Sequence, residues 1–142
     1  MATVVATSSA SRNAYRILHF AYTVAPLIAG IDKFFDKLVD WDQYLAPAVA
    51  SRVPAHTFML AVGVIEIIAG LIVLFKPRIG AWIVGAWLLG IVINLLTYPG
   101  FFDVALRDFG LSLGAFALAF LSADFESRPT KEVTAPVVPR PV

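Results

Sequence analysis

Long apolar runs, separated by short polar stretches, dominate the sequence. Four of these runs are candidate membrane-spanning helices, which we place at residues 16–35, 57–75, 79–96 and 107–123. The two middle runs are each long enough to cross a bilayer, and only residues 76–78 separate them, so we expect an antiparallel hairpin. The pattern predicts an all-α fold, specifically an integral membrane four-helix bundle.

The first and last runs are shorter than the roughly 20 residues that a span requires. If they cross, their charged ends are drawn toward the hydrocarbon: Asp32 and Lys33 in the first run, Arg107 and Asp108 in the last. A cleavable signal peptide is the alternative for the first run. Because Pro26 interrupts that run and no small-residue cleavage site follows it, we interpret it as a retained anchor.

The two ends of the chain differ in composition from the apolar region. Residues 1–13 are rich in Ser, Thr and Ala, and the last residues contain four prolines, which cannot continue a helix. We therefore predict three segments: a flexible amino terminus at 1–13, a four-helix transmembrane domain at 14–123, and a Pro-rich tail at 124–142.

The composition agrees with a membrane protein. Of the 142 residues, 59% are hydrophobic and only 15% are charged, whereas a soluble domain carries about 25% charged residues. Four spans leave no room for a soluble catalytic domain. The net charge of +1, with Lys and Arg scattered along the chain, argues against nucleic acid as a partner, and the absence of cysteine excludes thiol chemistry and iron–sulfur clusters.

Lys and Arg residues divide unequally between the two sides of the predicted bundle. Seven lie in the amino terminus, the middle hairpin and the tail, and four lie on the other side. The positive-inside rule predicts that the richer side is cytoplasmic, and with it both termini. Acidic residues gather on the extracytoplasmic side, which this rule does not explain.

These acidic residues concentrate in the segment 32–45, directly after the first span. At helical spacing its aspartates line one side and its aromatic residues another, which predicts an amphipathic extracytoplasmic loop helix. In one interpretation this helix lies at the membrane surface, with Trp41 and Tyr44 at the level of the lipid headgroups. In the other, Asp32, Lys33 and Asp36 cap a polar cavity between the helices.

Glu66 interrupts the second run near its middle. An ionisable group near the centre of a bilayer costs about 2.5–3.5 kcal/mol on insertion scales, so it usually faces a partner or a cavity. Gly63 and Gly70 share its face of the helix and allow a neighbouring helix to approach closely. Two interpretations remain open: a functional carboxylate, or a carboxylic acid whose hydrogen bond only fixes the packing.

Other polar residues lie in the same half of the predicted bundle. Asn94 lies near the outer end of the third run, and Arg107 and Asp108 open the fourth. Arg107 can reach Glu66 only if the fourth helix begins about a turn before its apolar run. The ligand-binding or proton-linked candidates are Glu66, Asp32, Lys33, Asp36, Asn94, Arg107 and Asp108.

No pattern in the sequence indicates a ligated or covalent cofactor. His19 and His56 are placed at opposite faces of the membrane and cannot hold one haem iron. Neither a catalytic triad nor a metal-binding motif is present, so we predict no catalytic residue, no metal site, and a quinone or a lipid as the molecule that a cavity could hold.

The polar and glycine positions together resemble the DoxX-like family of small four-helix membrane proteins. The resemblance covers about residues 14–123. It is carried by Gly-Ile-Asp-Lys at 30–33, Gly-Val-Ile-Glu-Ile-Ile-Ala-Gly at 63–70, the Pro/Arg hairpin, and Arg-Asp-Phe-Gly-Leu at 107–111. It implies a multi-pass protein of the bacterial or archaeal cytoplasmic membrane, associated with oxidoreductase systems.

Two classes of function fit these observations. The first is a non-catalytic accessory subunit of a membrane oxidoreductase or other energy-transducing complex, whose partners are membrane lipids and larger subunits or further copies of itself. The second is a stand-alone membrane redox or ligand-binding protein, which holds a quinone-like lipophilic molecule in an outer-leaflet cavity. In that case Glu66 exchanges the proton.

Overall fold

The computed structural model describes residues 9–127, and this part of the chain is helical throughout apart from its turns and loops. Four long helices account for most of it, and a 3₁₀ turn and one short helix lie between the first two. The elements are α1 (Ser9–Asp32), η1 (Trp41–Tyr44), α2 (Pro47–Ala50), α3 (Ala55–Phe75), α4 (Pro77–Leu96) and α5 (Phe102–Glu126). The all-α, four-helix fold is confirmed.

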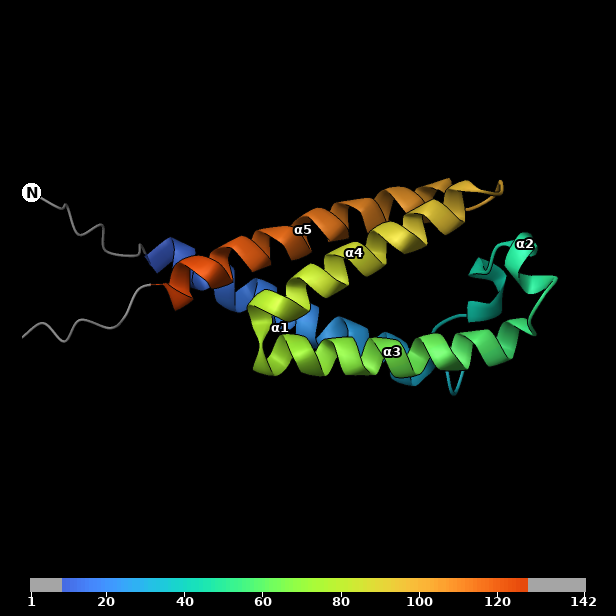
Figure 1. The fold of residues 1–142 in the computed structure, drawn as a ribbon, viewed down its shortest axis with the longest axis horizontal. Coiled ribbons are helices and arrows are strands. Elements are labelled where there is room, and N and C mark those ends of the chain that lie inside the picture. Colours follow the sequence, from blue (N-terminus) through green and yellow to red (C-terminus); the bar gives the residue numbers. More distant parts are fainter. Residues whose placement is uncertain (1–8, 128–142) are drawn as a thin grey trace, which may run out of the picture.

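Each of the four long helices is long and apolar enough to cross a membrane, so the chain is a multi-pass membrane protein. Successive long helices run in opposite directions, and both ends of the described chain lie at the same end of the bundle (Figure 1). There the ring of Tyr15 in α1 packs against that of Phe125 in α5, with centroids 4.9 Å apart. Both of these ends therefore lie on one side of the membrane.

The helices form two pairs, α1 with α3 and α4 with α5 (Figure 1). The pairs meet near the α3–α4 connection, where Lys76 alone separates the helices and Pro77 begins α4 without losing a helical hydrogen bond. From there the pairs diverge, and the loop with η1 and α2 lies at the wide end. The predicted tight hairpin is confirmed.

The outer helices extend beyond the apolar runs that predicted them. Residues 9–13, predicted to be flexible, belong to α1, and residues 124–126, assigned to the tail, belong to α5. Polar residues continue a helix where their side chains reach water, so an apolar run underestimates its length. Residues 1–8 and 128–142, including the prolines of the predicted tail, lie outside the described residues.

The loop after α1 is not the continuous amphipathic helix predicted for residues 32–45. The helix ends at Asp32, and Asp36 has a φ of 47°, which breaks helical continuity. The Asp32 carboxylate accepts hydrogen bonds from the backbone N–H groups of Lys37 and Leu38, at 3.2 and 3.0 Å. These bonds turn the chain back toward the bundle, and only η1 and α2 are helical.

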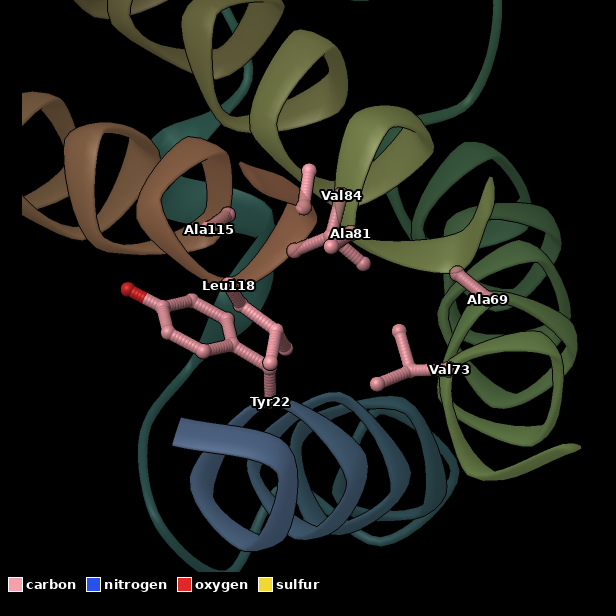
Figure 2. Close-up of a cluster of buried hydrophobic side chains, with 8 residues drawn as sticks. Tyr22, Ala69, Val73, Ala81, Val84, Ala115 and Leu118 are labelled. Carbon is pink, nitrogen blue, oxygen red and sulfur yellow. The ribbon is translucent and has the colours of Figure 1, made fainter. Parts of the chain in front are cut away.

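The core is divided between the two ends of the bundle. At the narrow end, side chains from all four long helices form one cluster (Figure 2): Tyr22, Ala69, Val73, Ala81, Val84, Ala115, Leu118 and Ala119. At the wide end the loop supplies core residues. Leu45 packs with Met59 and Val62 of α3, and Tyr44 also reaches the cluster formed by α4 and α5. The loop therefore fills the space between the diverging pairs.

Candidate functional site

The centre of the candidate site is an ion pair between Lys33 and Glu66. The Lys33 Nζ donates to Glu66 Oε2 at 2.6 Å, and the two side chains are only 3% and 12% exposed. Lys33 directly follows α1, and Glu66 lies in the middle of α3. Two charges removed from water are costly individually, so each depends on the other for compensation.

Glycines bring the two charged groups together. A Cβ added to Gly63 would lie 2.7 Å from the Gly30 carbonyl oxygen and 3.1 Å from the Lys33 Cβ, and one added to Gly30 would lie 2.6 Å from the Gly63 carbonyl oxygen. The backbones of α1 and α3 are thus in direct contact. Gly70, one turn beyond Glu66, packs in the same way against Leu27. The prediction that the glycine face of Glu66 is a close helix contact is confirmed.

Two tryptophans enclose the ion pair. The ring centroid of Trp41 lies 3.6 Å from the Lys33 Nζ, in a cation–π contact. The indole of Trp87, from α4, faces the Glu66 carboxylate. Its Nε1 is buried and has no hydrogen-bond partner of normal length among the described residues. The indole N–H of Trp87 is therefore a donor group beside the carboxylate.

Asp32 holds the loop to the end of α1. Besides the two backbone groups of the loop, its carboxylate accepts from the Trp41 Nε1 at 2.8 Å. This bond sets the position of the ring over Lys33. Asp32 therefore contributes to the site through Trp41 and not by contact with Glu66.

Asn94 holds the same loop to α4. Its side-chain oxygen accepts from the Ala46 N–H at 3.1 Å, and its side-chain nitrogen donates to the Tyr44 carbonyl at 2.7 Å. The hydroxyl of Tyr98 adds a bond to the Gln43 carbonyl at 3.2 Å. Asn94, predicted to line a cavity with Glu66, thus has a different role, because both of its hydrogen-bonding groups are used by the loop backbone.

Arg107 is directed away from the ion pair. Helix α5 begins at Phe102, before its apolar run, as contact between Arg107 and Glu66 would require. The Arg107 side chain is nevertheless 62% exposed, and its Nε donates to Asp108 on the same helix at 2.9 Å. Lys33, and not Arg107, is the partner of Glu66. Asp108 is buried and close enough to Glu66 for their charges to interact, whereas Asp36 is exposed.

The structure thus surrounds Glu66 with groups that come from the other three long helices or their ends. Lys33 comes from the end of α1, Trp87 from α4 and Asp108 from α5. The space in front of the carboxylate, where a cavity was predicted, is occupied by the Lys33 ammonium under Trp41. One shallow hollow lies on the outer surface where the end of α1 meets the start of the loop, and another lies on the outer surface of α3 near its end.

Trp87 is the residue of this site that the sequence did not identify. It lies in an uninterrupted apolar run, where it looks like Trp82, which is exposed on the same helix. Only the rotation of α4 about its axis distinguishes the two residues, and the apolar pattern does not set that rotation because the run is apolar on every side.

The histidines lie at opposite ends of the bundle, as predicted. His19 Nε2 lies 2.9 Å from the Val73 carbonyl near the narrow end, and His56 Nδ1 lies 3.7 Å from Asp42 at the wide end. Within residues 9–127, no group of three or more His, Cys, Asp or Glu side chains is arranged to hold a metal ion.

Comparison with known proteins assigns neither a family nor a function to the chain. No family model matches the chain, and searches of curated proteins and of solved structures find no match. The resemblance to the DoxX-like family stays a prediction from the residues that carry it.

Proposed function

We propose that this chain is a proton-linked binding protein of an oxidoreductase system in a bacterial or archaeal cytoplasmic membrane. In this proposal the Lys33–Glu66 pair holds the polar end of a quinone-like lipophilic molecule. The observation that carries it is the burial of a complete ion pair between membrane-spanning helices. Ionisable residues in such positions are costly and commonly belong to ligand sites or proton relays.

The surroundings of the pair support binding of a hydrogen-bond acceptor. The Trp87 Nε1 offers an N–H without a partner of normal length among the described residues, and the Lys33 ammonium has further protons beyond the one donated to Glu66. In this proposal a carbonyl or phenolic oxygen of the ligand accepts hydrogen bonds from both groups. The aromatic rings of Trp41 and Trp87 suit the ring to which such an oxygen is attached.

The short contact between the two side chains supports the proton-linked role. At 2.6 Å the Lys33 Nζ donates directly to the Glu66 carboxylate, with no atom between the two groups. When the oxidoreductase system delivers electrons to a bound quinone, the reduced oxygen takes up a proton from the Lys33 ammonium and leaves a neutral amine beside Glu66. Glu66 is then the group that controls return of the proton.

Glu66→Gln tests this role because it preserves shape and removes the charge. We expect the variant to fold, because the Gln side-chain oxygen still accepts from the Lys33 Nζ and Trp41 still covers the ammonium. It should lose most of the lipophilic molecule that copurifies with the wild type in mild detergent. The measurement is mass spectrometry of solvent extracts, normalised to protein. A variant that retains the molecule at the wild-type level would contradict the proposal, and so would a wild type that carries only phospholipid.

A second candidate function is a non-catalytic accessory subunit of a larger membrane complex, and uncovered glycines favour it. Among the described residues, an added Cβ at Gly90 of α4 or at Gly110 of α5 would meet no atom within 4 Å. These positions leave room for a helix of another subunit. Gly80 and Gly85, in contrast, pack within the bundle against Val73 and Phe116. Copurification of large subunits without a bound lipophilic molecule is the outcome that selects this candidate.

The orientation in the membrane is part of the proposal. With four spans and seven of eleven Lys and Arg residues on one side, both termini are expected in the cytoplasm and the loop with η1 outside. A phosphatase fused after Val142 should be inactive and a fluorescent protein at the same site should fluoresce. An active phosphatase together with a non-fluorescent reporter would contradict this orientation and place the Lys33–Glu66 pair in the inner half of the membrane.

A further inference from the structure

The loop between α1 and α3 covers the ion pair from the wide end of the bundle. Residues 37–46, which we call the lid, run from the end of α1 across to α4. Leu45 and Ala46 are buried at 7% and 4% exposure, although they lie in a loop. Trp41 of the lid lies directly on Lys33. A ligand that enters from this end has to displace part of the lid.

Besides the 3.7 Å contact of Asp42 with His56 and the bond from Tyr98 to Gln43, the lid is attached through Asp32 and Asn94. These two attachments differ in what they join. Asp32 is five, six and nine residues from the groups that it binds, so these bonds join the lid to the adjoining end of α1. Asn94 is 48 and 50 residues from its partners and belongs to the other helix pair. The Asp32 bonds therefore form the hinge, and the Asn94 bonds form the latch.

The latch consists of only two hydrogen bonds, although it holds the ten residues of the lid against α4. Apart from the Tyr98 hydroxyl, the two hydrogen bonds of Asn94 are the direct polar connection described between the lid and α4. Release of both would weaken the hold of α4 on the lid, which would then rest on the Tyr98 hydroxyl and on the packing of Tyr44 and Leu45, while the Asp32 bonds stay intact. We expect that movement to uncover the side of Glu66 that faces Trp87, whose indole Nε1 is buried beside the carboxylate.

We propose that the lid is a gate, and that the hydrogen bonds of Asn94 control access to the Lys33–Glu66 site. This inference rests on the proposed function, because it concerns entry to the same site. Access of a water-soluble reagent to the space under the lid is nevertheless a property of the protein without ligand. This access is therefore measured independently of ligand binding.

A cysteine reporter tests the gate, since the natural chain contains no cysteine. Val62 is buried under the lid, four residues before Glu66 on the same face of α3. Val73 is buried at the narrow end of the same helix. Val62→Cys and Val73→Cys are made singly in the full chain, and the rate of reaction with a charged, water-soluble thiosulfonate is followed in proteoliposomes.

Each reporter is combined with Asn94→Leu, which keeps the size of the side chain and removes both hydrogen bonds. The Val62→Cys rate should rise at least about tenfold, since two bonds of ordinary strength are lost and the Ala46 N–H is left without its partner. The Val73→Cys rate should stay at its slow value. Thr97→Val is the matched control, because the Thr97 hydroxyl binds only the Asn94 carbonyl of its own helix turn, and it should change neither rate.

Two results would overturn the gate. An unchanged Val62→Cys rate in the Asn94→Leu background would show that the latch does not limit access. An equal rise at Val62→Cys and Val73→Cys would show loosening of the whole bundle. Neither result depends on a bound ligand. The gate proposal can therefore fail while Glu66→Gln still abolishes binding. Conversely, if the protein binds no lipophilic molecule, the two cysteine reaction rates still test the gate.

Discussion

Replacement of Lys33 with methionine is expected to destabilise the folded protein by about 3–5 kcal/mol, the largest single effect that the structure predicts. Methionine fills a similar volume, so packing is largely kept. The loss arises because the Glu66 carboxylate stays buried between α1 and α3 with its only ion-pair partner in the described structure removed. A buried charge without compensation costs far more than the pair contributes when it is complete.

Lys37→Met is the matched control for this variant. Lys37 lies four residues farther along and is exposed, so its removal should change the free energy of unfolding by less than about 0.5 kcal/mol. Both variants are unfolded by increasing the SDS fraction in mixed micelles, with helicity followed by far-UV circular dichroism. Equal stability of the two variants would contradict the buried pair.

The double variant Lys33→Met, Glu66→Leu separates the two contributions. Replacement of a complete buried ion pair by apolar residues of similar volume is often neutral or stabilising, so the double variant should recover most of the stability lost by Lys33→Met. A double variant as unstable as the single one would mean that Lys33 acts through Trp41 or the loop and not through Glu66. The site would then have lost its central interaction.

Apolar runs predicted the four helices because each run corresponds to one membrane crossing, and the energy of that crossing depends mainly on composition. They also predicted that Glu66 faces another helix, since its glycine neighbours share its side of α3. The sequence does not select the partner of Glu66. Lys33 and Arg107 both lie at helix ends on the same side, and the rotation of each helix decides which of them points inward.

The loop was predicted poorly because its conformation depends on distant residues. Spacing alone favoured a helix through Asp36, yet Asp32 binds the loop backbone and Asn94 binds Tyr44 and Ala46 from about 50 residues away. The residues of the loop itself do not indicate such long-range contacts. The charged stripe that suggested a surface helix is instead divided between Asp32, which is buried, and Asp36, which is exposed.

Close contact between the helix backbones is as necessary to the site as the charges themselves. The Gly63 position leaves no space for a methyl group, since the nearest atom is the Gly30 carbonyl oxygen, a backbone atom that cannot rotate away. Gly63→Ala should therefore force α1 and α3 apart and destabilise the protein by about 1–3 kcal/mol. Gly90→Ala, where an added Cβ meets no atom within 4 Å, should be neutral within about 0.5 kcal/mol in the same assay.

Two causes can destabilise the Gly63→Ala variant: a general packing defect, or displacement of the Lys33–Glu66 ion pair. They differ in one measurable quantity. The coupling between Lys33 and Glu66, obtained from the single and double variants, is expected to fall when the cycle is repeated in the Gly63→Ala background. It should stay unchanged in the Gly90→Ala background. Coupling that stays at its wild-type value in the destabilised Gly63→Ala protein would show that the ion pair tolerates separation of the helices. In that case the glycines serve packing alone, and the geometry of the site is set by the loop and by its attachments, among them those at Asp32 and Asn94.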